Sequence, residues 1–321
     1  MDAALYLRDL EAKPAALACL ADSFRGSDPL APLPEAPSRV LMLGMGSSRY
    51  AAADAALRMR SAGINAVAEY ASATVGWPPS ADLLVLAISA SGESAETIAA
   101  VERYRGRARV VALTDAPRST IATLADDVIP LGSGEERGGV ACRSFQHTRL
   151  VLRAIEARLG GRPVDVPVLC ERVGEATQDL LDRRQEWLPE VAATLDGPDG
   201  VFLLAPADRL ASAEQGALMI REGPRRPSVG CETGDWSHVD VYLTKTLEYR
   251  ALLFAGSPWD GEALDWLAKR GSTFVAVGAE LPGARTVVRH AGDDDPEVAA
   301  LGEVLVPELV AANWWAGADG G

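Results

Sequence analysis

The sequence predicts an α/β protein of about two domains, each built on a parallel sheet flanked by helices. Apolar, strand-like segments alternate with amphipathic, helix-like segments along the first half of the chain. A second, shorter pattern of the same kind begins near residue 198. The length of 321 residues is enough for two hydrophobic cores. Such alternation is typical of parallel sheets that are covered by helices on both faces.

In the first half, short runs rich in Val, Ile, Leu and Ala predict strands, and helical patterns fall between them. The expected strands are Arg39–Leu43, Ala66–Tyr70, Leu83–Ile88, Val110–Leu113 and Asp127–Pro130. The expected helices are Tyr50–Ala62, Glu93–Tyr104 and Ser144–Leu159. In folds of this class, ligands bind beyond the carboxyl ends of the strands.

The second half repeats the alternation after a helical connector. Residues 165–195 have a helical period of apolar positions with charges on the opposite face. Beyond them we expect strands at Val201–Leu204, Ala251–Phe254 and Thr273–Val277, with helices at Ala211–Glu222 and Pro296–Trp315.

Composition excludes several function classes. No apolar run reaches the roughly 18 residues of a membrane span, and Met1–Ala4 has no basic charge typical of a signal peptide, so we expect a cytoplasmic protein. The net charge of −14 argues against nucleic acid or an anionic membrane as partner. The four cysteines lie far apart in no metal-binding spacing, so we expect free thiols and no metal. We also expect no cofactor.

Two turns predict a phosphate site. Ser89–Ser94 (Ser-Ala-Ser-Gly-Glu-Ser) joins an apolar strand to a helix, where backbone N–H groups and the helix dipole favour an anion. Three serine hydroxyls add donors at the same point. Gly44–Ser48 ends another strand in the same way. Taken alone, the Ser89–Ser94 turn could also be an ordinary helix cap with Ser91 at the N-cap.

Gly44-Met45-Gly46 also permits a dinucleotide interpretation. Glu69 lies 23 residues after Gly46, near where a ribose-binding acid belongs. However, Arg49 stands where the third glycine of that motif is required. A purely structural alternative is that these glycines only allow a tight strand-to-helix turn. Ser47 and Ser48 favour a sugar phosphate over both.

With these turns the chain resembles the double sugar-isomerase (SIS) domain proteins, in particular the isomerase half of glucosamine-6-phosphate synthase and its stand-alone relatives. Residues 43–48 resemble that family's L-A-C-G-T-S loop, and residues 89–94 its S-Q-S-G-E-T phosphate loop. Residues 9–14 and 139–145 resemble the family's E-I-x-E-Q-P and V-A-S/A-T-K-S-F segments. The resemblance implies these substrate- and phosphate-binding residues: Ser47, Ser48, Ser89, Ser91, Ser94, Val140 and Ala141.

The resemblance extends to the second half. Residues 216–222 resemble G-A-L-K-L-K-E, which carries the family's catalytic glutamate, and residues 234–238 resemble G-E-L-K-H, which carries its ring-opening histidine. It implies that Glu222 moves the proton between C1 and C2 and that His238 opens the sugar ring across the interface of a homodimer. Independently, a carboxylate at the end of a helix meets the negative dipole end, which tends to raise its pKa.

Two departures from the family limit what the resemblance implies. Met219 replaces the lysine three residues before the catalytic glutamate, and no lysine follows Lys269, whereas the family's tail carries one that closes over the sugar. We therefore expect a hexose 6-phosphate isomerase, or an amino-sugar-phosphate isomerase or deaminase, without a glutaminase domain in this chain. Two alternatives stay open: a non-catalytic sugar-phosphate sensor, and a nucleotide-dependent oxidoreductase with bound NAD or FAD.

The resemblance also implies that each SIS domain has a flavodoxin-like parallel sheet flanked by helices, and it implies domain boundaries. We expect an N-terminal helical segment over residues 1–36, a first SIS domain with the phosphate loop over 37–160, connecting helices over 161–197, and a second SIS domain with Glu222 and His238 over 198–321.

Overall fold

The computed structural model describes residues 1–318, and the chain divides into two compact units. The first-sheet unit comprises residues 15–135 and 143–171. The second-sheet unit comprises residues 1–14, residues 136–142 and the chain from residue 172 on. The second-sheet unit is therefore built from three separate stretches of sequence, two of which are short.

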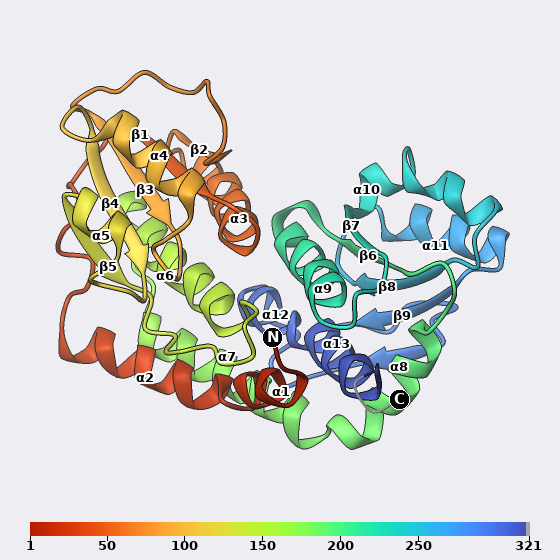
Figure 1. Ribbon diagram of the computed structural model, residues 1–321. Helices are drawn as coiled ribbons and strands as arrows, with labels where there is room; N and C mark the ends of the chain where they lie inside the picture. Colours follow the sequence, from red (N-terminus) through yellow and green to blue (C-terminus); the bar gives the residue numbers. More distant parts are fainter. Residues whose placement is uncertain (319–321) are drawn as a thin grey trace. The chain divides into compact units, whose positions relative to one another are not determined.

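The first-sheet unit holds a five-stranded parallel sheet in the order β2-β1-β3-β4-β5 (Figure 1). Every residue of β3 is buried, which explains its continuous apolar sequence. On one face, Leu41 and Leu43 pack against Ala100 and Val101 of α4. The strands are β1 Arg39–Gly44, β2 Ala66–Tyr70, β3 Leu83–Ile88, β4 Arg109–Thr114 and β5 Asp127–Pro130, and the helices are α2 Lys13–Gly26, α3 Ser47–Ser61, α4 Ala95–Tyr104, α5 Thr120–Leu124 and α6 Arg143–Gly160.

The second-sheet unit repeats this architecture with the strand order β10-β9-β8-β6-β7, again all parallel. Its strands are β6 Val201–Ala205, β7 Ser228–Glu232, β8 Arg250–Phe254, β9 Thr273–Val277 and β10 Thr286–Val288. Its helices are α1 Ala3–Glu11, α8 Arg184–Leu195, α9 Leu210–Glu222, α10 Thr233–Trp236, α11 Asp260–Arg270, α12 Pro296–Gly302 and α13 Leu305–Ala318, with short 3-10 helices at Ala207–Arg209 and Asp240–Lys245; α7 Val166–Asp182 begins in the first-sheet unit. The fold class predicted from the sequence, two helix-flanked parallel sheets, is confirmed.

Several element boundaries differ from the sequence prediction. The helix expected from Glu93 begins at Ala95, because Ser94 caps it with its side chain. The single C-terminal helix expected from Pro296 is two helices, α12 and α13. The connector is likewise split into α7 and α8. These breaks interrupt patterns whose apolar period continues on both sides, so periodicity alone did not reveal them.

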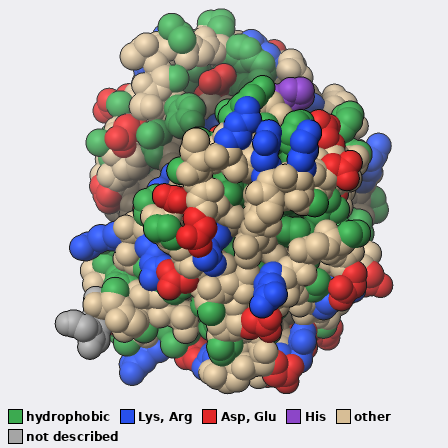
Figure 2. Space-filling view, turned by 90° about the vertical axis from the view of Figure 1, so that its right-hand side faces the viewer, with side chains coloured by type: hydrophobic (Ala, Val, Ile, Leu, Met, Phe, Trp, Pro, Cys, Tyr) green, Lys and Arg blue, Asp and Glu red, His purple; other side chains and the backbone are tan. Residues whose placement is uncertain are grey.

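The charged surface does not follow the sign of the net charge everywhere. Figure 2 shows acidic and basic side chains interspersed on one face, with hydrophobic side chains between them. Across residues 1–318, no helix has the length and apolar composition that crossing a bilayer requires.

A fully buried ion pair joins the two ends of the second-sheet unit. The Lys13 ammonium donates to Glu308 of α13, and both side chains have an exposure of 0%. Burial raises the pKa of Glu308 to about 7, although the cation of Lys13 lowers it. The pair ties Lys13, the first residue of α2, to α13, and α1, which ends two residues earlier, packs on α13 through contacts such as Tyr6 with Trp315.

Breaking this pair should cost much more than breaking an exposed one. In Glu308→Ala the Lys13 cation stays buried without its partner, and we expect the free energy of unfolding to fall by about 3–5 kcal/mol. The double replacement Lys13→Met/Glu308→Leu leaves no buried charge and should lose clearly less. The control Arg184→Ala removes a half-exposed pair with Glu11 of α1 and should lose no more than about 1 kcal/mol. Urea unfolding measures all four proteins; equal losses in Glu308→Ala and Arg184→Ala would contradict this account.

Candidate functional site

Two serine-rich turns meet at the point where the strand order of the first sheet reverses. β1 and β3 are neighbours, and Leu43 lies opposite Ala87. From β1 the chain continues to β2 on one side, and from β3 it continues to β4 on the other. The turns that follow β1 and β3 therefore diverge and leave a crevice between them, which is where parallel α/β sheets bind ligands. The structure brings Ser47 and Ser48 to the same sheet edge as Ser89, Ser91 and Ser94.

The turn after β1 needs its glycines for steric reasons. A side chain at Gly44 would place Cβ 2.9 Å from Cβ of Ser48, closer than packed atoms come. Gly46 has φ +51° and precedes the first turn of α3, which begins with Ser47 and Ser48. The purely structural interpretation, a tight strand-to-helix turn that glycine allows, thus explains the glycines. It leaves the two half-buried serines unexplained.

The second turn presents hydroxyls whose oxygens already accept backbone hydrogen bonds. Ser89 is buried, and its Oγ accepts the Gly92 N–H at 3.1 Å. Ser91 is exposed, and its Oγ accepts the Glu93 N–H at 3.3 Å. Because the oxygens accept, the O–H protons of both serines can point outward as donors. The N–H groups of Ala90 and Ser91 donate to no acceptor in the described part of the chain.

Ser94, and not Ser91, caps α4, so the N-cap assignment considered for Ser91 is wrong. Ser94 Oγ accepts the Thr97 N–H at 3.4 Å and donates to Glu96 at 3.0 Å. Ser91 lies outside the helix, in the turn before it. This leaves Ser91 without a helix-capping role.

Two anchors that the sequence did not reveal fix the shape of this turn. The Glu93 carboxylate accepts the N–H and the hydroxyl of Thr120, both at 2.8 Å, and these bonds lower the pKa of Glu93. The Thr114 hydroxyl donates to the carbonyl of Ala90 at 3.0 Å. The turn is therefore tied to the end of β4 and to the start of α5, so its donors are held in place before any ligand binds.

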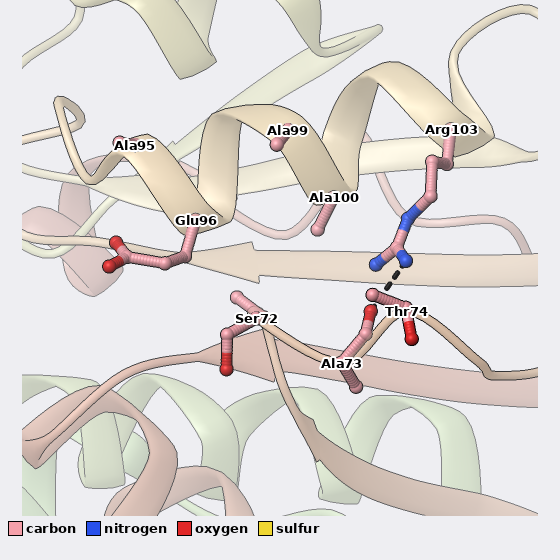
Figure 3. Close-up of a pocket in the computed structure, with 9 residues that line it drawn as sticks. Ser72, Ala73, Thr74, Ala95, Glu96, Ala99, Ala100 and Arg103 are labelled. Carbon is pink, nitrogen blue, oxygen red and sulfur yellow. Dashed lines mark hydrogen bonds between the residues drawn. The ribbon is translucent and has the colours of Figure 1, made fainter.

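A groove of about 420 Å³ runs along α4, between that helix and the segment after β2 (Figure 3). Ala95, Ala99 and Ala100 form its helix side. The Arg103 guanidinium donates to the carbonyl of Ala73 and so closes one end. The charged groups that line the groove, Arg103 and Glu96, are both hydrogen-bonded to neighbours, which leaves mostly small side chains along it.

The corresponding crevice of the second sheet is filled by an arginine. It lies between the turns that follow β6 and β8, where the strand order reverses again. The Arg209 guanidinium donates to the carbonyl of Ala255 and forms an ion pair with Glu303 at 2.6 Å. A side chain at Gly256 would come within 2.9 Å of it. The serine in the turn after β8, Ser257, is buried, and its Oγ accepts the Trp259 N–H at 3.2 Å.

Glu222 lies in a half-buried position at the end of α9 in the second-sheet unit. Burial raises its pKa, although the neighbouring Arg221 lowers it. The direction agrees with the sequence expectation, but the main cause is loss of water. The glycine that follows packs so closely on Trp315 that a Cβ there would be 2.7 Å from the ring. The charge of Glu222 also helps to raise the pKa of buried Tyr6, after burial itself and other charges.

His238 lies far from Glu222 within one chain. It is exposed, in the turn after β7 and α10, at the carboxyl edge of the second sheet. α9 runs back from the carboxyl edge to the amino edge, because it connects the parallel strands β6 and β7. Its 13 residues span about 20 Å, and Glu222 is the last of them. The two residues therefore lie at opposite ends of the strands, Glu222 at the amino ends and His238 at the carboxyl ends.

Val140 and Ala141 belong to the same unit as Glu222. Val140 is buried in one hydrophobic cluster with Tyr6, Met219 and Trp315, and Ala141 is half-buried. The sequence-predicted site residues thus form two groups. The five serines lie in the first-sheet unit, and Val140, Ala141, Glu222 and His238 lie in the second-sheet unit.

Comparison with known proteins finds a family match in the first half of the chain. The family model of the SIS domain matches residues 34–156. Curated relatives include glutamine–fructose-6-phosphate aminotransferases (isomerizing) from Aeropyrum pernix, 25% identical over 86% of this chain and 47% of the relative, and from Gloeobacter violaceus, 25% identical over 57% and 32%. The chain thus spans about a third to a half of the length of these relatives.

Solved structures share the fold over nearly the whole chain. The C-terminal domain of glucosamine-fructose-6-phosphate aminotransferase from Francisella tularensis has a TM-score of 0.80 at 16% identity, covering 97% of this chain and 96% of that one. Tagatose-6-phosphate ketose/aldose isomerase from Escherichia coli has 0.80 at 15%, covering 98% and 93%. Glucosamine-6-phosphate deaminase from Thermotoga maritima has 0.76 at 16%, covering 98% and 95%.

Gly92 should be the least replaceable glycine of the serine turn. It has φ +67°, and a Cβ there would lie 1.9 Å from Ser119 Oγ. Gly106 has φ +69° but open space around it, so Gly106→Ala isolates the backbone strain of about 1–2 kcal/mol. We expect Gly92→Ala to lower the free energy of unfolding by clearly more than Gly106→Ala, as measured by urea unfolding. Equal losses would mean that the turn yields easily and is not preformed.

Proposed function

We propose that this chain is a phosphosugar isomerase, or an amino-sugar-phosphate isomerase or deaminase, that acts on a hexose 6-phosphate. Both sheets would then be SIS domains, of which only the first binds phosphate. The observation that carries the proposal is the preformed pair of serine turns at the reversal point of the first sheet. Support comes from the SIS match over that region and from the fold shared with proteins named as isomerases and a deaminase of sugar phosphates.

The serine turns supply the donors that a phosphate dianion needs. We assign Ser47, Ser48, Ser89, Ser91 and Ser94 to the phosphate, together with free backbone N–H groups of the second turn; Ser94 would exchange its hydrogen bond to Glu96 for one to the phosphate. Their hydroxyls are neutral, so the ligand brings the charge and the protein brings oriented dipoles. Neutral donors explain how an acidic protein with a net charge of −14 would bind an anion.

Glu222 is the residue we assign to proton transfer. Its carboxylate would take the proton from C2 of the open-chain aldose. The C–H electron pair would form the C1–C2 double bond of an enediolate, and the π electrons of the C1 carbonyl would move to O1. The carboxylic acid would then return the proton to C1 while one proton passes from O2 to O1, which yields the ketose. A raised pKa suits both halves of this shuttle, because the group must accept and release a proton near neutral pH.

We assign ring opening to His238 of a neighbouring chain. Within one chain Glu222 and His238 lie at opposite ends of the strands of the second sheet, so one sugar cannot contact both. If both act on one sugar, the histidine has to come from a second copy of the chain. A homodimer with shared sites satisfies this requirement.

A non-catalytic sugar-phosphate sensor is the second candidate, and one observation favours it. Met219 stands where the resembling enzymes have a lysine, and it is 1% exposed within the hydrophobic cluster of α9 and α13. Lys13 is buried in its pair with Glu308, and the ammonium of Lys245 lies 5.2 Å from the ring centre of Tyr242. We propose that turnover, if present, proceeds without a Schiff base.

Removing the carboxylate of Glu222 should stop proton transfer but not binding. We expect Glu222→Gln to abolish incorporation of deuterium at C1 and C2 of fructose, glucose or glucosamine 6-phosphate in heavy water, followed by NMR. The control is Glu262→Gln, because Glu262 is an exposed residue of α11.

In the wild type, kcat/KM should fall as the pH drops through a value above the usual glutamate pKa of about 4.3, because only the carboxylate accepts the proton. Unchanged deuterium incorporation in Glu222→Gln rules out the assignment of Glu222 to proton transfer. If the wild type binds a sugar phosphate without deuterium incorporation, the sensor is favoured. Release of ammonia from glucosamine 6-phosphate favours deamination.

Mixing two inactive variants tests the shared site. Glu222→Gln and His238→Ala should each be inactive alone. In a mixed dimer one site carries both substitutions and the other carries neither, so refolding them together at equal amounts should restore about a quarter of wild-type activity. No recovery would show that His238 does not act on the partner's site.

A further inference from the structure

Residues 136–142 are a short segment that belongs to the second-sheet unit, although the chain on both sides of it belongs to the first-sheet unit. Seven residues cannot form a core of their own. Their position must come from contacts with other parts of the second-sheet unit. Val140 and Ala141, which we assign to substrate binding, lie in this segment.

The front of the segment is fixed to α1. The Gly138 N–H donates to Asp9 Oδ2 at 2.7 Å, in a buried hydrogen bond, and the Gly138 carbonyl accepts the Asp2 N–H at 3.2 Å. No side chain would fit at Gly138, since a Cβ there would be 2.5 Å from Cα of Tyr6. Backbone thus lies directly on backbone at this point, and Asp9 is 5% exposed.

The back of the segment is fixed to α9. Gln215 Nε2 donates to the carbonyl of Ala141 at 2.6 Å, and Gln215 is fully buried. The next residue, Cys142, donates its N–H to Glu136 Oε1 at 2.6 Å, which closes the segment on itself. α9 is the helix that ends at Glu222, so one helix positions both the proton-transfer group and this segment.

Between these fixed points, two donors are left without partners. The N–H groups of Val140 and Ala141 donate to no acceptor in residues 1–318. Leaving backbone donors unpaired in a half-buried place is costly unless a ligand or water takes them up. Held donors of this kind suit a hydroxyl or carbonyl oxygen of a sugar.

We propose that Asp9 and Gln215 are positioning residues that hold the Val140 and Ala141 N–H groups in place for the oxygens of the sugar. This inference rests on the proposed function and deepens it. Asp9 and Gln215 touch the segment and not the sugar. Their effect should therefore be confined to the sugar part of the ligand, because we assign the phosphate to the serine turns.

Two measurements on the full chain test the proposal. The first is hydrogen exchange of residues 136–142 without ligand, and the second is affinity for fructose 6-phosphate and for inorganic phosphate by calorimetry. In Asp9→Ala we expect faster exchange in this segment and a loss of fructose 6-phosphate affinity of about 10- to 100-fold, with unchanged affinity for phosphate. Asp9→Asn keeps an acceptor oxygen for the Gly138 N–H and should restore most of the affinity.

Two further variants separate positioning from folding. Gln215→Met removes the donor to Ala141 at similar size and should act like Asp9→Ala, from the other end of the segment. Glu11→Ala, on the same helix as Asp9, removes only a half-exposed ion pair and should change neither measurement. If Asp9→Ala fails to fold, Gln215→Met decides the question by the same two measurements.

Several outcomes overturn the proposal. They are unchanged exchange of residues 136–142 in both Asp9→Ala and Gln215→Met, equal losses for fructose 6-phosphate and phosphate, or no rescue by Asp9→Asn. A wild-type chain that binds phosphate but none of the three hexose phosphates named above overturns the proposed function instead. In that case faster exchange in both variants still supports the positioning role, and unchanged exchange removes it as well.

Discussion

The reversal of strand order within each parallel sheet is the constraint on which the rest of this molecule depends. Two parallel strands must be joined by a crossover, usually a helix. Where the crossovers that follow two neighbouring strands go to opposite sides of the sheet, a crevice opens at the carboxyl ends of those strands. Both sheets have this topology, so the fold provides two such crevices. The side chains decide their use. Serine-rich turns border the first one, whereas Arg209 with its partner Glu303 lies at the second.

Much of the fold was predictable because central strands have a distinctive sequence. β3 and β6 are buried along their whole length and read as continuous apolar runs. The strands that sequence analysis missed, β7 and β10, lie at the two edges of the second sheet and are only partly buried. An edge strand needs fewer apolar residues, so Ser228–Glu232 gives no strand signal. Helix α11 was also missed.

The candidate site was predictable where it depends on neighbours in sequence and not where it depends on distant contacts. The serine turns and the helix-end glutamate follow from local patterns. The anchoring of Glu93 to Thr120 links residues 27 positions apart, and that of Gly138 to Asp9 links residues 129 positions apart. Nothing in the local sequence specifies such pairs. The assignment of residues 136–142 to the second-sheet unit is unpredictable for the same reason.

The buried Lys13–Glu308 pair has a consequence for the order of folding during synthesis. Its two residues are 295 positions apart, so at 5–20 residues per second Lys13 is made about 15–60 s before Glu308. The first-sheet unit is complete in sequence by residue 171 and can fold in that interval. The second-sheet unit has to wait for α13, and until then α1 lacks this helix as a partner and Lys13 lacks its counter-charge. During synthesis, the buried charge of Lys13 is therefore neutralised only after almost all of the second-sheet unit has been made.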